Sequence, residues 1–460
     1  MLRRVTAATE RGAAPDRELA DEAQRICQAL LRIDTTNPPG NERPAAELVA
    51  DELARAGLDP RLLERTPGRT NVVARLRGDG TRAPLLLTAH LDVVEADPST
   101  WRRPPFSGDL ADGCLWGRGA VDMKNMAAMC VALLGRLARE KRPLSRDIIF
   151  AAVADEEAGC DEGSAFLCRE HADLVRAEYA IGEGGGFTLR LAGQTLYPVQ
   201  VAEKGLLWLK ARVRGTPGHG SMPREDSAVV RLAAAIARLG ARALPVHPPP
   251  ILHEFFRQAT ARAPAVLRAL VPRLLTPALA PAVLRLLPDK SVARGLAALL
   301  SNTASPTVFR AGNKTNVIPG VAECEIDGRI LPGQTADDLL RELREVMGPD
   351  VELETLRSTP PMETRPYESP LFDNIVRVMA DHAPGALVVP YLLPGFTDGQ
   401  FFSRIGARWY GFAPVRLPED LRFAELFHGN DERIPVEGLR WGAGVLADLV
   451  QRFCAKEGSS

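Results

Sequence analysis

Apolar, strand-like runs that contain or end in histidine and carboxylate residues are the feature that most constrains this chain. LLLTAHLDVV contains His90 and Asp92, whose i, i+2 spacing predicts that both side chains leave one face of a strand. IIFAAVADEEAGC passes directly into Glu156 and Glu157, and YAIGEGGGF ends in Glu183. Adjacent glutamates repel each other unless a cation or a shared proton separates them, and buried polar groups need partners. These segments therefore predict one shared polar site.

Two further segments supply candidate ligands. GRGAVDMKN places Asp122 just after a glycine turn, and ELFHGNDERIPVEGL places His428 in a loop before a helical run. Ligands of open α/β sheets bind at the carboxyl ends of strands, so we expect all these segments to meet in one crevice. Histidine with carboxylate, and without thiolate, suits zinc or a similar divalent metal, and two-metal sites commonly share a bridging carboxylate. Taken singly, each residue has an ordinary structural explanation, but their joint occurrence favours a metal site.

The motifs TAHLDVV, GRGAVDMKN, DEEAGC, GEGGG, PGHGSMP and FHGNDERIPVEGL, in this order, resemble those of the cocatalytic dizinc metallopeptidases. That family includes aminoacylase, glutamate carboxypeptidase, acetylornithine deacetylase and succinyl-diaminopimelate desuccinylase. The resemblance implies an α/β, zinc-peptidase-like catalytic domain with a mixed sheet flanked by helices. It also implies an inserted two-layer α+β lid domain through which two copies form a homodimer. It indicates the family and not the member.

The resemblance assigns a role to each candidate ligand. His90 and Glu183 would hold one metal, Glu157 and His428 the other, and Asp122 would bridge both. Two zinc ions are implied, and cobalt or manganese would accept the same ligands.

Two more residues of these motifs have implied roles without being ligands. Glu156 would be the general base, which takes a proton from the attacking water and passes it to the departing amine. Asp92 would accept a hydrogen bond from His90 and so fix the orientation of its ring.

Another group of implied residues lies outside the metal motifs. His219 in PGHGSMP would stabilise the oxyanion of the tetrahedral intermediate, typically in the site of a partner subunit. Asn316 in KTNVIPG and Arg329 in CEIDGRILPG match positions that bind a substrate carboxylate or polarise its carbonyl, and Gly395 in GFTDGQFF matches a loop that lines the pocket. From the residues alone, a loop histidine is the favoured interpretation of His219, and the alternative for Arg329 is an ordinary strand-surface arginine.

Composition agrees with a cytoplasmic enzyme. The 460 residues are 45% hydrophobic and carry 57 basic and 58 acidic side chains, so nothing indicates binding to nucleic acid. The N-terminus, MLRRVTAATERGAAPDRE, lacks the apolar segment of a signal peptide. No segment approaches the roughly 20 uninterrupted apolar residues of a transmembrane helix. Seven cysteines without CxxC pairs predict reduced, packing thiols.

The order of strand and helix patterns predicts the domains. A catalytic domain is expected over residues 1–203 and 356–460, interrupted by a lid domain over 204–355. Within the lid, an apolar, basic and proline-punctuated helical insertion is expected at about 243–305. Such helices suit a membrane surface or an apolar substrate, but packing on the lid or at a subunit contact is the favoured interpretation.

These observations predict a metal-dependent hydrolase that cleaves an amide or peptide bond of an N-acyl amino acid or small peptide with a free carboxylate. A carboxypeptidase or dipeptidase is the nearest alternative, because it differs from a deacylase in pocket shape rather than in metal chemistry. A catalytically silent binding protein with this fold would be expected to lack ligands, and none is missing. A dinuclear phosphoesterase would leave PGHGSMP and the Glu156–Glu157 pair unexplained.

Overall fold

The chain divides into two compact units in the computed structural model, which describes residues 17–191 and 193–456. Unit 1 comprises Met1–Val199, Pro366–Val388 and Phe401–Ser460, and unit 2 comprises Gln200–Arg365 and Val389–Gln400. Unit 2 is wider than the lid domain expected at 204–355, because residues on both sides of that range and Val389–Gln400 pack with it. Most of the N-terminal segment from which we expect a cytoplasmic location lies outside the described residues.

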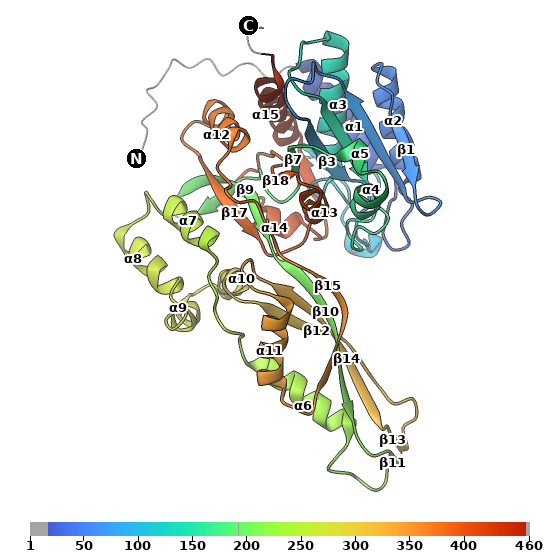
Figure 1. Ribbon diagram of the computed structural model, residues 1–460, viewed down its shortest axis with the longest axis vertical. Coiled ribbons are helices and arrows are strands. Elements are labelled where there is room, and N and C mark those ends of the chain that lie inside the picture. Colours follow the sequence, from blue (N-terminus) through green and yellow to red (C-terminus); the bar gives the residue numbers. More distant parts are fainter. Residues whose placement is uncertain (1–16, 192, 457–460) are drawn as a thin grey trace. The chain divides into compact units, whose positions relative to one another are not determined.

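Unit 1 is built on a mixed sheet, as expected (Figure 1). The strand order is β1 (Arg61–Glu64), β2 (Thr70–Leu76), β6 (Ile148–Val153), β3 (Leu85–His90), β7 (Tyr179–Gly182) and β18 (Arg408–Gly411). The last four strands are parallel, whereas β1 and β2 form an antiparallel edge. Both faces of β3 and β6 are buried, which explains their unbroken apolar sequences. Because the four parallel strands point the same way, their carboxyl ends share one edge.

Helices of unit 1 pack around this sheet. The long helices α1 (Arg17–Leu31), α3 (Lys124–Glu140) and α15 (Val436–Cys454) contact one another, α2 (Arg43–Arg55) packs on α3 and β2, and α12 (Pro370–His382) packs on α15. The shorter helices are α4 (Ser164–Glu170), α5 (Ala172–Val175), α13 (Gly399–Arg404), α14 (Phe423–Leu426) and the 3-10 helix Pro98–Thr100. Nearly every residue of α3 between Lys124 and Leu137 is buried, so this helix is central to the core.

A small three-stranded sheet joins distant parts of unit 1. Its order is β19 (Arg433–Pro435), β5 (Cys114–Trp116) and β4 (Asp109–Ala111). The pairing of β19 with β5 ties the segment that follows His428 to the segment that precedes Asp122. Two residues more than 300 positions apart in the sequence are thereby brought into one region.

Unit 2 contains a four-stranded antiparallel sheet covered on one face by helices. The strand order is β12 (Thr303–Ala311), β14 (Val321–Ile330), β10 (Gly205–Arg214) and β15 (Glu352–Thr359). Alternate residues of β10 and β14 join a core with α6 (Ala228–Ala241) and α11 (Ala336–Met347). The other face is charged, since Arg212 contacts Glu323 at 2.6 Å. This alternation is typical of an antiparallel sheet with one face in water.

Shorter strands and the helical insertion complete unit 2. The short strands of unit 2 are β11 (Gly218–His219), β13 (Val317–Ile318) and β16 (Met362–Glu363). Strand β8 (Leu189–Leu191) belongs to unit 1. Strands β9 (Gln194–Glu203) and β17 (Leu387–Leu393) each begin in unit 1 and end in unit 2. The insertion consists of α7 (Pro250–Ala259), α8 (Ala265–Leu274), α9 (Ala280–Leu286) and α10 (Lys290–Leu300). Over residues 17–191 and 193–456, no helix has both the length and the apolarity needed to cross a membrane.

Gly182, the last residue of β7, leaves room for the side chain of Trp409 on the neighbouring strand β18. A Cβ atom at this position would lie 2.2 Å from a ring carbon of the fully buried Trp409. We expect Gly182→Ala to lower the free energy of unfolding by about 1–3 kcal/mol, because a buried indole has no room to move away. Denaturant unfolding measures this change.

Gly444→Ala is the matched control in the same unit. Gly444 lies inside α15, and no atom would come within 4 Å of an added Cβ. Replacing a helical glycine by alanine is expected to raise the free energy of unfolding by about 1 kcal/mol. If Gly182→Ala were as stable as the wild type, the close contact with Trp409 would have no energetic consequence.

Candidate metal centre

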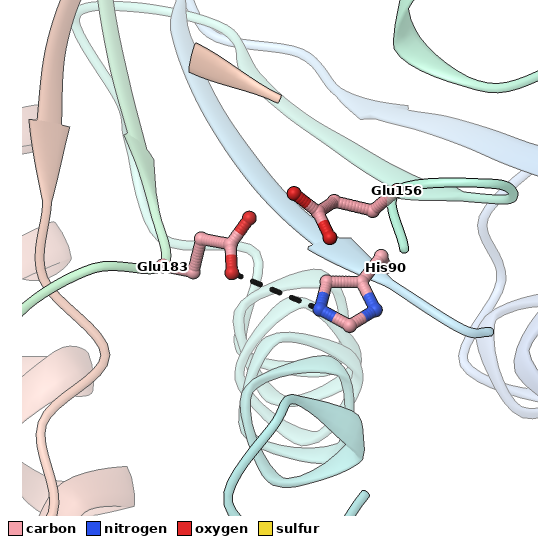
Figure 2. A group of neighbouring side chains, drawn as sticks. All are labelled: His90, Glu156 and Glu183. Carbon is pink, nitrogen blue, oxygen red and sulfur yellow. Dashed lines mark ion pairs between the residues drawn. The ribbon is translucent and has the colours of Figure 1, made fainter. Parts of the chain in front are cut away.

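Three parallel strands bring their polar ends together at one edge of the sheet in unit 1. His90 is the last residue of β3, Glu156 and Glu157 lie in the turn after β6, and Glu183 follows β7. Figure 2 shows the carboxylates of Glu156 and Glu183 turned toward the His90 ring. His90 Nε2 lies 3.7 Å from Glu183 Oε2, and ligand atoms of His90, Glu156 and Glu183 all lie within 4.8 Å of one another. This group can hold a metal ion.

Asp122 lies between the two histidines. Its Oδ1 is 3.1 Å from His90 Nε2, and its Oδ2 is 3.2 Å from His428 Nε2. His428 Nε2 also lies 3.1 Å from Glu157 Oε2. One carboxylate therefore faces two imidazoles with different oxygens, which is the geometry of a bridging ligand. The neighbours of each histidine are those that the resemblance implies.

The donor set fits divalent cations better than it fits an ion-free core. Four carboxylates and two imidazoles share the site, namely Asp122, Glu156, Glu157, Glu183, His90 and His428. That many acidic groups in a largely buried cluster are costly unless cations neutralise them. Oxygen and imidazole nitrogen ligands, without thiolate, are typical of zinc and related first-row metals.

The ionisation of the site reflects the same excess of acid. Burial opposes protonation of His428, but hydrogen bonds to Asp122 and Glu157 outweigh it and raise the pKa of His428 to about 10. Burial also disfavours the charged form of His90, yet Asp122 and Glu183 raise its pKa well above the usual value. Burial and the charge of Asp122 raise the pKa of Glu157. Protons on the histidines thus offset part of the negative charge that the carboxylates bring to the site.

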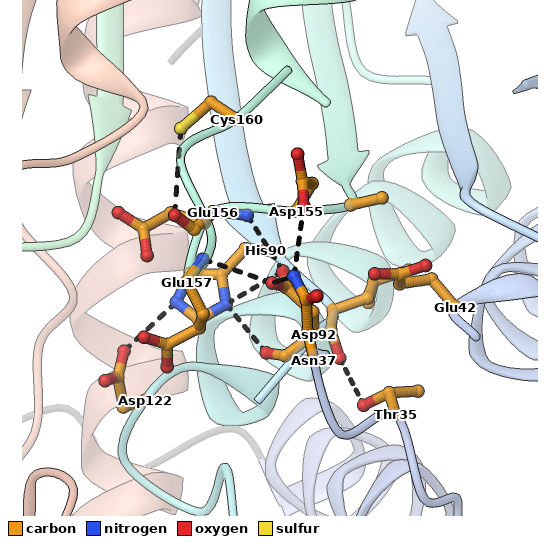
Figure 3. Close-up of polar contacts among 12 residues, drawn as sticks. Thr35, Asn37, Glu42, His90, Asp92, Asp122, Asp155, Glu156, Glu157 and Cys160 are labelled. Carbon is orange, nitrogen blue, oxygen red and sulfur yellow. Dashed lines mark hydrogen bonds and ion pairs between the residues drawn. The ribbon is translucent and has the colours of Figure 1, made fainter. Parts of the chain in front are cut away.

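Asp92 has a different role from the one expected. His90 Nδ1 lies 2.9 Å from the main-chain oxygen of Asp92, whereas the nearer carboxylate oxygen of Asp92 is 3.7 Å away. The expected hydrogen bond from His90 to the Asp92 carboxylate is therefore wrong. The carboxylate instead accepts hydrogen bonds from the main-chain N–H groups of Glu156 and Glu157, each at 3.1 Å (Figure 3). Strand β3 ends at His90, so Asp92 turns away from the ring and toward the acidic turn.

A buried polar network supports this turn, and the sequence patterns did not reveal it. Asn37 donates to Asp92 at 2.9 Å and to Asp155 at 3.1 Å (Figure 3). Arg69 donates to Asp155 at 2.9 Å and forms two hydrogen bonds, both 2.8 Å, with Glu42. Asp155 has a positive φ of 66°, an uncommon conformation that these contacts hold in place.

Glu432 is a second residue that sequence reasoning missed. It is fully buried, and its carboxylate accepts hydrogen bonds from Arg118 at 2.8 Å and from three main-chain N–H groups of the Asp122 loop. Those groups belong to Gly119 (2.9 Å), Val121 (2.8 Å) and Asp122 (3.2 Å). Burial, opposed by Arg118, raises the pKa of Glu432 to about 7. An acid four positions after His428 was the only sequence signal, and acids in loops are too common for it to be specific.

The residues implied for oxyanion and substrate contacts lie in unit 2. His219 on β11 is exposed, and it is paired across the ribbon with Val317 of β13, the residue after Asn316. Its Nδ1 lies 2.8 Å from Ser221 Oγ, and Gly220 N–H donates to the main-chain oxygen of Asn316 at 2.9 Å. The structure therefore brings His219 and Asn316 together on one two-stranded ribbon.

Arg329 is far from this ribbon. Strand β14 begins at Val321, close to the ribbon, and Arg329 lies near its other end, roughly 25 Å away at the rise of an extended strand. Arg329 forms an ion pair with Asp327 at 2.9 Å. Gly395 lies in a loop anchored through Thr397, whose hydroxyl donates to the buried Glu203 at 2.5 Å. One chain thus does not place Arg329 beside the His219–Asn316 pair.

Replacing Glu432 by glutamine tests whether this carboxylate positions Asp122. An amide NH2 would face N–H donors where the carboxylate accepts from them, so we expect about 1–3 kcal/mol less stability. We also expect metal affinity to fall by about 10–100-fold, as for other residues that orient ligands. Isothermal titration with zinc measures the affinity, and Glu425→Gln, at an exposed position of the same region, is the control. Equal affinity of the Glu432→Gln protein and the wild type would contradict this role.

Comparisons with known proteins agree with the geometry of the site. The model of peptidase family M20/M25/M40 matches residues 86–452. N-fatty-acyl-amino acid synthase/hydrolase PM20D1 of Xenopus tropicalis is 29% identical over 81% of this chain and 73% of its own length. Probable carboxypeptidase S-like 2 of Dictyostelium discoideum is 29% identical over 79% of this chain and 70% of its own.

A solved structure shares the fold. The M20 family metallo-carboxypeptidase Sso-CP2 from Sulfolobus solfataricus superimposes with a TM-score of 0.70 at 18% identity, covering 94% of this chain and 99% of that one. The expected family is therefore confirmed. The match extends over more than half of the chain, from β3 with His90 to α15 beyond His428. The chain belongs to peptidase family M20/M25/M40 and is a hydrolytic enzyme.

Proposed function

We propose that this enzyme uses two metal ions to hydrolyse the amide bond of N-acyl amino acids that carry a free carboxylate. The observation that carries the proposal is Asp122, which faces His90 and His428 with separate oxygens. His90 and Glu183 would hold one ion, Glu157 and His428 the other, and Asp122 both. Zinc suits these ligands, and cobalt or manganese are alternatives. When bound, such ions polarise a carbonyl and make an attacking water more acidic.

Glu156 is the residue that we propose moves the proton. Its carboxylate lies beside His90 (Figure 2), and its main chain is fixed by the hydrogen bond to Asp92. A carboxylate held next to the reacting water can accept its proton and deliver it to the nitrogen of the departing amine. Asp92 and Glu432 would act as positioning residues, because they hold the Glu156–Glu157 turn and the Asp122 loop.

We further propose that a second copy of the chain completes the site. His219 would donate a hydrogen bond to the developing oxyanion, and Arg329 would bind the substrate carboxylate. Roughly 25 Å of strand separates them within one chain, which is longer than an amino acid substrate. If both contact one substrate, they must come from different chains. This separation supports a homodimer formed through unit 2.

The relatives support two substrate branches. Relatives named N-fatty-acyl-amino acid synthase/hydrolase, together with the apolar helical insertion, favour a long apolar acyl group. The relative named probable carboxypeptidase S-like 2 favours the alternative, a peptide with a free C-terminus. Both branches need the same metal chemistry, so only the substrate distinguishes them.

Amine release from matched substrates tests the proposal. We expect zinc-loaded enzyme to hydrolyse N-acyl amino acids, with long acyl chains preferred over N-acetyl, and to lose activity when a chelator removes the metal. Activity should return on adding zinc, cobalt or manganese. Dipeptides and C-terminally amidated analogues are the comparison substrates, and faster release from dipeptides would favour the peptidase branch. Cleavage that resists the chelator would contradict the metal mechanism.

Glu156→Gln tests the general base. Glutamine keeps the size and the main-chain hydrogen bond to Asp92 but cannot take up a proton, so we expect kcat to fall by about 10²–10⁴-fold. Metal content, measured by elemental analysis, should stay near that of the wild type. Glu170→Gln, an exposed change in α4, is the control. Near-normal kcat in Glu156→Gln would assign the base to another residue.

A further inference from the structure

The helical insertion of unit 2 exposes several large apolar side chains. Helices α8 and α9 contact each other, and α9 contacts α10. The most exposed large apolar residues of these helices and their connections are Leu286 (84%), Val266 (72%), Val292 (51%), Leu279 (46%) and Leu267 (42%). We call these residues, with the basic residues Arg262, Arg268, Arg273, Arg285, Lys290 and Arg294, the α8–α10 surface.

The same helical insertion is rich in basic residues. Between Glu254 and Asp289 the sequence contains no acidic residue, yet it contains arginines at 257, 262, 268, 273 and 285. Arg257 forms an ion pair with Glu254. Within residues 17–191 and 193–456, the arginines of the α8–α10 surface form no ion pair with an acid. The whole chain has a formal net charge of −1, so the rest of the molecule is acidic.

The charged face of the four-stranded sheet shows that this pattern is not general. Its arginines face acids across neighbouring strands, with Arg212 at 2.6 Å from Glu323 and Arg214 at 3.0 Å from Glu352. These two arginines of the sheet are thus paired with acids within the fold. Those of the α8–α10 surface carry an excess positive charge outward, next to exposed leucine and valine.

We propose that the α8–α10 surface docks the enzyme on an anionic lipid bilayer. Apolar side chains interleaved with arginine are typical of helices that lie in the interface of a bilayer, where the arginines attract acidic headgroups. Helices α8 and α9 have 10 and 7 residues, too few to span a bilayer, so they would lie along its surface. Docking would also bring the enzyme to amphiphilic acyl substrates dissolved in the membrane, although it does not depend on that activity.

Two other occupants fit the surface less well. A second copy of the chain, related by a two-fold axis, would set the arginines of one surface against those of the other. A protein partner would be expected to use aromatic anchors, which are enriched in protein interfaces, and the sequence between Phe256 and Phe309 contains no aromatic residue. Charge therefore favours the anionic bilayer.

Sedimentation of the full-length protein with lipid vesicles tests the proposal. We expect binding to vesicles of phosphatidylcholine mixed with phosphatidylglycerol, weak or no binding to phosphatidylcholine alone, and loss of binding as salt is raised. The Glu156→Gln protein should bind vesicles as the wild type does, so a failure of docking and a failure of the proposed hydrolysis are distinguishable.

Two sets of variants separate charge from apolar contact. Arg262→Gln, Arg268→Gln and Arg285→Gln together should weaken binding on the order of a hundredfold, at about fivefold for each basic residue. Val266→Ser with Leu286→Ser should weaken it about tenfold or more. The matched controls remove exposed residues of unit 1: Arg61→Gln, Arg169→Gln and Arg377→Gln for charge, and Leu62→Ser with Val376→Ser for apolar area.

Each outcome either supports or overturns docking of the α8–α10 surface on an anionic bilayer. Docking is supported if the variants of the α8–α10 surface lose vesicle binding and the control variants bind as the wild type does. No binding to anionic vesicles, equal binding to neutral vesicles, or equal loss in the controls overturns it. A change from dimer to monomer in Val266→Ser with Leu286→Ser, without a change in vesicle binding, would also overturn it and identify the surface as an interface between copies.

Discussion

Repulsion among carboxylates at one sheet edge is the constraint on which the rest of unit 1 depends. Parallel strands deliver Glu156, Glu157 and Glu183 to the same place as His90, and the Asp122 loop adds another acid. Such a cluster is stable only with positive charge within it, from protons on the histidines or from metal ions. The fold therefore holds the acids together, and positive charge within the cluster offsets the cost of doing so.

The supporting network explains how these acids keep their geometry. The Asp92 carboxylate accepts hydrogen bonds from the main-chain N–H groups of the Glu156–Glu157 turn. The Glu432 carboxylate accepts them from the N–H groups of the Asp122 loop. Both carboxylates are buried, and each has its acceptor capacity used by donors that would otherwise be unsatisfied. Neither Asp92 nor Glu432 needs to touch a metal ion or a substrate. Both hold main-chain segments that carry candidate ligands, the Glu156–Glu157 turn and the Asp122 loop.

Unit 2 is stabilised by apolar packing on one face of its sheet and by ion pairs on the other. Its sheet has an apolar face under α6 and α11 and a charged face whose arginines are paired with acids. The helical insertion departs from this balance, because within the described residues it exposes unpaired arginines together with leucines such as Leu286 and Leu279. Exposed apolar area beside unbalanced charge commonly marks an interaction surface.

Three of the candidate metal ligands could be picked out from the sequence because they interrupt or end an apolar run, where a polar side chain needs a partner. His90, Glu157 and Glu183 carry that local signal, and so does the alternation that predicted the sheet of unit 2. No comparable local signal in the sequence indicates what Asp92, Glu432, Asn37 and Arg69 contact. Asp92 was expected to accept a hydrogen bond from the ring of His90, yet strand β3 ends at His90, so the i, i+2 alternation does not continue to Asp92.

The sequence by itself determined the apolar periodicity, hence the strands and helices, and the chemical types of the ligands. Only the tertiary structure decided which main-chain groups the buried carboxylates serve and how far Arg329 lies from His219. The physical reason is range: periodicity and residue type act locally, whereas a hydrogen bond such as that from the Asp122 amide to Glu432 joins segments 310 residues apart. Such partners are chosen by the packing of the whole unit.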